Sequence, residues 1–162
     1  MGNRITNRKA GTERSLKLSN GSTDVLLSVL LLSGSDLARS PWEVELVTWL
    51  AQHDQGVLGG GTVGFDLDAI AWDRDGFEDQ HAFVLGIVDA AMRGHRWAVL
   101  PYDPPFVTEQ LAQLRELLLE YSAAFVDSGK SWDRSPPRRH ALCPRHAVHT
   151  DDEGCLLCHD GQ

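Results

Sequence analysis

Three cysteines and a histidine near the end of the chain have the residue types and the spacing of a metal site. The two pairs are Cys143 with His146 and Cys155 with Cys158, and each pair has two residues between its members. This spacing lets one tight turn direct both side chains at the same ion, and two such turns supply the four corners of a tetrahedron. The sequence therefore predicts one Zn²⁺ ion held by these four side chains.

The segment from residue 143 to residue 158 resembles the paired knuckles of short zinc ribbons. Three thiolates and one imidazole leave no open coordination position, so the expected ion is structural rather than catalytic. The predicted zinc-binding tail, residues 142–162, has too few large apolar side chains to order itself. Metal binding can supply on the order of 10 kcal/mol of apparent folding free energy to such a segment.

Alternatives remain open for the fourth ligand and for the cofactor. His149 and His159 lie near enough in the sequence to replace His146. Residues 155–159 also match the C-x-x-C-H pattern that attaches c-type haem. Haem attachment normally requires export and would leave Cys143 and His146 unexplained, and a redox C-x-x-C pair usually opens a helix beside a strand. The zinc interpretation accounts for all four residues and is preferred.

Capping and hydrophobic patterns predict a mainly α-helical domain over residues 22–128, with three principal helices and a short β-element. Ser40, Pro41 and Glu43 form a capping box that starts the first clear helix, and Gly56 ends it. Residues 24–32 are almost entirely apolar, a pattern that fits either a buried helix or a buried strand. A cap in the residues around Ser22 favours the helix.

Two further long helices are expected, at residues 75–93 and from about residue 105 or 108 to residue 126. The apolar face of the earlier helix consists of Phe77, Val84, Leu85, Val88 and Met92. The later helix carries the clearest stripe, which consists of Val107, Leu111, Leu114, Leu118, Tyr121 and Phe125. Most such stripes pack within their own chain, so we expect a core face rather than a partner-binding seam. Between these helices, Asp66 should cap a short helix and residues 96–102 should be extended.

Charge is distributed unevenly along the 162 residues. Residues 1–35 carry five basic and two acidic side chains, whereas residues 36–128 carry five basic and sixteen acidic ones, a net charge of −11. An acidic body repels phosphate backbones, which argues against nucleic-acid binding by the main domain. The composition predicts a flexible basic arm over residues 1–21 and a linker over residues 129–141.

The expected location is the cytoplasm. The N-terminal residues lack the apolar core of a secretory signal. No apolar run approaches the roughly 20 residues of a transmembrane helix. The Ala-, Leu-, Arg- and Asp-rich composition suggests a bacterial protein, in which N-myristoylation of the Met1-Gly2 start is not expected.

The leading functional hypothesis is a non-enzymatic, zinc-stabilised protein-interaction module: an adaptor, a regulator or an acidic inhibitor of a partner protein. Its basis is the acidic body, the closed metal site and the lack of a catalytic motif. The first alternative is a zinc-dependent regulator that binds nucleic acid through Arg134, Arg138, Arg139 and Arg145 and through the N-terminal arm. Acidic residues between the two ligand pairs weaken that alternative.

A second alternative is an enzyme with its site near the glycine-rich residues 56–64, beside Asp66, Trp72 and His81. Residues 59–64 match the G-x-G-x-x-G pattern, but they follow an expected helix rather than a strand. The pattern therefore indicates a connection and not a dinucleotide site. Lone histidines such as His81 are expected to be solvated or hydrogen-bonded structural residues.

Overall fold

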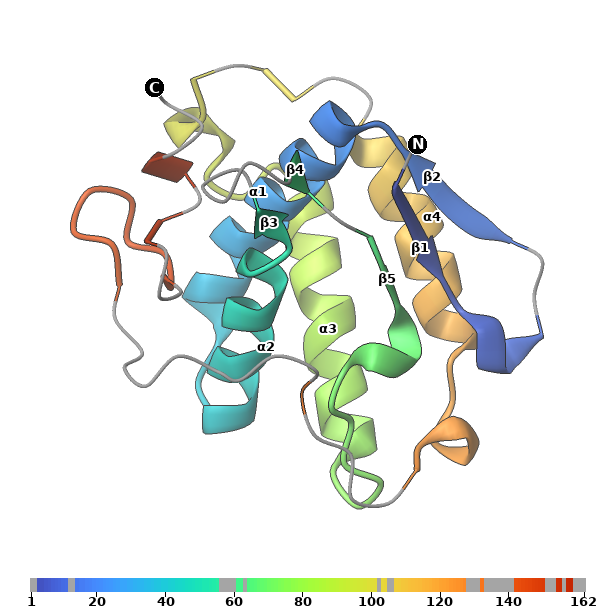
Figure 1. Ribbon diagram of the computed structural model, residues 1–162. Coiled ribbons are helices and arrows are strands. Elements are labelled where there is room, and N and C mark those ends of the chain that lie inside the picture. Colours follow the sequence, from blue (N-terminus) through green and yellow to red (C-terminus); the bar gives the residue numbers. More distant parts are fainter. Residues whose placement is uncertain are drawn as a thin grey trace.

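The computed structural model describes residues 3–11, 14–55, 61–62, 64–101, 103–104, 107–127, 132, 142–150, 154–155 and 157–158. Within these residues, four α-helices form the bulk of the protein and a small three-stranded sheet lies beside them (Figure 1). The prediction of a mainly α-helical fold with a short β-element is confirmed. None of the helices in the described ranges is both long and apolar enough to cross a membrane.

Helix α1 (Asn20–Leu37) is central and contacts each of the other three long helices. It includes the ambiguous apolar segment, so the preference for a helix there is confirmed. Its N-cap is Ser19, whose hydroxyl accepts a hydrogen bond from the Ser22 N–H. Apolar side chains point outward on all sides because neighbouring helices surround it. At Gly34 the packing is so close that a Cβ atom would lie 2.8 Å from a Val47 methyl group.

Helix α2 (Pro41–Ala51) begins with the predicted capping box. The Ser40 hydroxyl accepts a hydrogen bond from the Glu43 N–H at 3.2 Å, and the Glu43 carboxylate accepts one from the Ser40 N–H at 3.0 Å. These two bonds satisfy backbone donors that have no partner inside the helix. The helix ends at Ala51, earlier than predicted, and Gly56 lies outside the described residues.

Helices α3 (Phe77–Met92) and α4 (Val107–Glu120) pack against each other. The predicted stripe on α4 is a core face, because Val107, Leu111, Leu114, Leu118 and Tyr121 are all buried. Helix α4 ends before Tyr121, and a separate 3₁₀ turn, η5 (Ala123–Phe125), follows it.

The prediction of an extended segment over residues 96–102 is wrong. A 3₁₀ turn, η4 (Trp97–Val99), occupies this segment. Gly94 and Arg96 have positive φ angles of 79° and 59°, respectively. They reverse the chain directly after α3, which leaves no straight run for a strand.

The N-terminal residues form a pair of strands, β1 (Asn3–Thr6) and β2 (Ser15–Leu18), rather than a flexible arm. Three shorter strands lie further along the chain: β3 (Asp54–Gln55), β4 (Gly61–Thr62) and β5 (Phe65–Asp66). Strand β1 pairs antiparallel with β2 and parallel with β5, whereas β3 and β4 pair separately. Ile5, Leu16 and Leu18 are buried, and this apolar contact outweighs the polar composition that predicted an arm. Gly64 is required beside β1, since a Cβ atom there would clash with the Arg4 backbone.

Candidate metal centre

The four predicted ligand side chains converge on one point. The Nδ1 atom of His146 lies 3.7 Å from the Cys143 sulfur, 3.6 Å from the Cys155 sulfur and 3.4 Å from the Cys158 sulfur. The Cys143 and Cys158 sulfurs are 3.7 Å apart. All four ligand atoms lie within 4.8 Å of one another, so together they could hold a metal ion.

These separations match a tetrahedral ion. With metal–sulfur bonds of about 2.3 Å and metal–nitrogen bonds of about 2.0–2.1 Å, neighbouring ligand atoms of a tetrahedron lie about 3.5–3.8 Å apart. The four measured separations run from 3.4 to 3.7 Å. The two remaining separations, from Cys155 to Cys143 and to Cys158, are below 4.8 Å, so the four ligand atoms are spaced closely enough to hold one cation.

Each ligand pair is held by a turn of the same design. The Cys143 sulfur accepts backbone N–H bonds from Arg145 and His146. The Cys155 sulfur accepts the equivalent N–H bonds from Leu157 and Cys158, again two and three residues further on. Hydrogen bonds to a charged acceptor are among the stronger ones, so both turns favour the thiolate that a metal needs. The spacing of two residues seen in the sequence is the spacing that such a turn requires.

The first cysteines of the two turns differ in their proton affinity. Burial is the largest influence on Cys143 and raises its pKa, but hydrogen bonds from His146, Arg145 and Cys155 outweigh it and lower the pKa to about 6. Burial is also the largest influence on Cys155 and, with the neighbouring Cys143 sulfur, raises its pKa to about 12. Without a metal, the site therefore combines a thiolate and a thiol at neutral pH. Metal binding must displace the proton of Cys155.

Contacts from the helical body hold the loop that carries the first ligand pair. The Arg96 guanidinium donates to the carbonyl oxygens of His146 and Ala147, and it also bonds to the Asp36 carboxylate at the end of α1. Asp36 is fixed in turn by His95, whose Nε2 lies 2.7 Å from the other carboxylate oxygen. The loop that carries Cys143 and His146 is thereby joined to the ends of α1 and α3.

The tail is also continuous with the hydrophobic core. Cys143, Val148, Cys155 and Leu157 are buried in the same cluster of side chains as the helices. The His149 N–H donates to the Ser35 hydroxyl of α1 at 3.0 Å, and the Cys143 N–H donates to the Val148 carbonyl at 2.8 Å. The tail therefore covers one end of α1 and does not form a separate body.

Among the alternative ligands, His149 does not belong to the converging group. Its backbone is used instead to bond Ser35. His159 lies outside the described residues, as do Arg134, Arg138 and Arg139 of the nucleic-acid hypothesis. Arg145 is exposed on the first turn.

The residues of the enzyme hypothesis have structural partners. Asp66 caps the 3₁₀ turn η3 (Leu67–Ala69), as predicted, and also bonds to Thr6. The Trp72 indole N–H donates to the Leu67 carbonyl, and His81 Nε2 lies 2.6 Å from the Leu118 carbonyl. A core cavity of about 20 Å³ behind this segment is lined by apolar side chains alone. Most of the glycine-rich residues 56–64 lie outside the described ranges.

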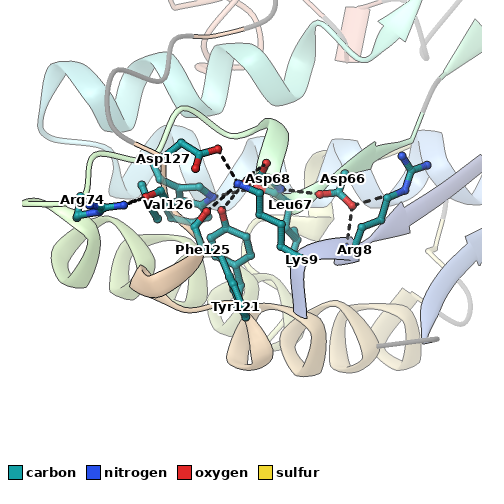
Figure 2. A network of polar contacts seen from close by, with 11 residues as sticks. Arg8, Lys9, Asp66, Leu67, Asp68, Arg74, Tyr121, Phe125, Val126 and Asp127 are labelled. Carbon is teal, nitrogen blue, oxygen red and sulfur yellow. Dashed lines mark hydrogen bonds and ion pairs between the residues drawn. The ribbon is translucent and has the colours of Figure 1, made fainter. Parts of the chain in front are cut away.

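Sequence reasoning missed a polar network that joins the N-terminal residues to the end of α4 (Figure 2). The Lys9 ammonium lies 2.7 Å from Asp127, 3.2 Å from Asp68 and 2.9 Å from the Phe125 carbonyl. Its hydrogen bond to Asp127 is the main reason why the pKa of Lys9 is raised. The Tyr121 hydroxyl donates to Asp68 at 2.7 Å, and burial followed by this bond raises the pKa of Tyr121. Asp68 and Asp127, which the sequence presents as free surface charge, thus connect segments that are far apart in the sequence.

Comparison with known proteins supplies no relative. No family model matches the chain, and no curated protein and no solved structure is significantly similar to it. A functional interpretation must therefore be built on the centre itself and on the surface around it.

Proposed function

We propose that the protein is a zinc-stabilised, non-enzymatic module that binds a partner protein, with one zinc ion in a structural role. Cys143, His146, Cys155 and Cys158 are its ligands in this proposal. The observation that carries it is the convergence of the four ligand atoms within 4.8 Å. Three sulfurs and one imidazole are a ligand set that zinc prefers, and four protein ligands leave no position for a substrate.

The acidic start of α3 is the surface that we propose for the partner. Asp73, Asp75, Glu78 and Asp79 are exposed, and no ion pair joins any of them to a basic side chain within the described part of the chain. By contrast, Asp36, Asp68 and Asp89 are paired with basic side chains. These seven residues carry four acidic side chains and one basic one, Arg74, and their net negative charge should attract a basic protein surface and speed its association.

Two experiments test the two parts of this proposal. Metal analysis of freshly purified protein should give one zinc per chain, and a value near zero would remove the structural role. For the partner, the zinc-loaded protein is used to capture proteins from a lysate at physiological salt. At least one captured protein should be lost when Asp73, Asp75, Glu78 and Asp79 are changed to Asn or Gln.

The matched control changes exposed acidic residues elsewhere, Asp103→Asn and Glu109→Gln, and should leave the capture unchanged. If the wild type captures no protein, or if both variants lose the same protein equally, the α3 surface is not the binding site. Salt-dependent binding to DNA or RNA instead would favour the nucleic-acid alternative.

A further inference from the structure

The three cysteines of the centre differ in their exposure to solvent. Cys143 and Cys155 are buried residues, at 5% and 6% exposure, whereas Cys158 is only partly buried. The Cys158 sulfur also lies 3.7 Å from the Cys143 sulfur. A disulfide bond is about 2.0 Å long, so a small movement of these two side chains would bring them within bonding distance. An accessible thiolate beside a second thiolate is the arrangement found in redox-sensing cysteines.

We propose that the centre responds to peroxide: Cys158 reacts with peroxide first, and Cys143 then forms a disulfide with Cys158. We call this device a latch, because the disulfide releases the tail from the helical body. This inference rests on the proposed zinc site. The Cys158 thiolate attacks hydrogen peroxide, the O–O bond breaks, and Cys158 sulfenic acid and hydroxide form. The Cys143 thiolate then attacks the sulfenic sulfur, the disulfide forms and a second hydroxide leaves. In total, the two thiolates lose two electrons, and one molecule of hydrogen peroxide gains them.

Oxidation removes two of the four ligands, and the remaining Cys155 and His146 cannot retain the ion. The turn around Cys143 then loses its geometry, because its sulfur no longer accepts the N–H bonds of Arg145 and His146. The carbonyl oxygen of His146 is one of the groups that Arg96 holds. Loss of the metal is thereby transmitted to the contacts with α1, and the tail is released from the body.

The test uses the full-length, zinc-loaded protein. Hydrogen peroxide is added in the presence of a colorimetric zinc indicator, and peptide mapping then locates any disulfide. We expect stoichiometric zinc release, a Cys143–Cys158 disulfide, and recovery of zinc binding after a thiol reductant and zinc are added. Hydrogen exchange of residues 142–150 should rise to the level of the chelator-treated protein.

Two matched variants separate the roles of the cysteines, since histidine can replace cysteine as a zinc ligand. Cys158→His removes the accessible thiol and should slow zinc release by peroxide roughly tenfold or more. Cys155→His keeps the reacting pair and should release zinc at a rate close to that of the wild type. Metal analysis first establishes that each variant binds one zinc.

The outcomes distinguish the two proposals. Purified protein without zinc contradicts the proposed function. Zinc that stays bound in peroxide, or a disulfide that joins Cys155 to either neighbour, overturns the latch and leaves the structural zinc site intact. These results come from the wild type, so the latch is falsifiable even if neither histidine variant folds.

Discussion

The helical body and the tail that carries the candidate metal centre differ in how many large apolar side chains they bury. Helix α1 alone buries six large apolar side chains, which are Leu26, Leu27, Val29, Leu30, Leu31 and Leu32, and Val25 packs against them partly buried. In the described part of the tail, Val148 and Leu157 are the buried apolar residues other than cysteines. Burial of apolar area stabilises the body far more than the tail, and a segment this poor in apolar area needs an additional source of free energy. If the proposed zinc site is filled, this difference predicts that the order of the tail depends on the metal and that of the body does not.

Removal of one ligand should have the largest effect and should be confined to the tail. Cys155→Ser removes a thiolate ligand, so we expect loss of zinc and of apparent binding free energy on the order of 10 kcal/mol. Metal analysis and far-ultraviolet circular dichroism measure the two regions separately. His149→Ala is the control, because His149 lies outside the ligand group. A Cys155→Ser protein that retained zinc, or that lost its helical signal, would contradict the expectation that only the tail depends on the metal.

A cavity in the core should instead destabilise the helical body. Leu31 on α1 is fully buried, so Leu31→Ala should lower the free energy of unfolding by about 2–5 kcal/mol. Urea denaturation followed by circular dichroism measures this change. Leu119→Ala, at a side chain that is 54% exposed, should change the free energy of unfolding by less than about 0.5 kcal/mol. Equal effects of the two substitutions would show that the helices pack differently.

The junction between the regions depends on Arg96. Arg96→Gln removes the guanidinium bonds to the carbonyls of His146 and Ala147, so tail docking should weaken by about 1.5–3 kcal/mol. Hydrogen exchange of residues 142–150 should rise while zinc remains bound. Arg145→Gln, an exposed position on the same loop, should leave the exchange unchanged. Zinc loss from the Arg96 variant would mean that docking and metal binding are inseparable.

Zinc affinity should increase with pH. Cys155, with a pKa raised to about 12, carries its proton throughout the neutral range and must release it to the solvent when the metal binds. The Cys155 proton alone should therefore raise the affinity by about tenfold per pH unit, or about 1.4 kcal/mol, and any further thiol proton released on binding adds to this slope. Cys143, with a pKa lowered to about 6, should steepen this dependence only below that pH. Competition with a chelator at several pH values measures the slope, and an affinity independent of pH would contradict the assignment of Cys155.

The ligand group and the capped helix α2 were predictable because their signals are local. The spacing within the Cys143–His146 and Cys155–Cys158 pairs corresponds to one turn each, and the Ser40–Glu43 capping box is a contact between near neighbours. Such patterns depend little on the rest of the fold.

The docking of the tail and the formation of strand β1 were not predictable. The Arg96 bonds to the tail and the Lys9 bonds to Asp127 join residues far apart in the sequence, and no periodic pattern marks them. The strand β1 contains one buried apolar residue, Ile5, among polar neighbours, so its composition suggested a flexible arm. The position of Trp132 was not predictable either. Its rings pack on Trp42 and Trp49, although the neighbouring residues in the sequence are mostly polar.

Hydrogen exchange with and without zinc tests most directly whether the metal orders the tail independently of the body. The exchange of every peptide is compared between the zinc-loaded protein and the protein treated with a strong chelator. We predict that protection is lost in residues 142–150 and retained in the centres of α1, α2, α3 and α4. Unchanged protection in the tail, or a loss of protection throughout the helices, would contradict the account.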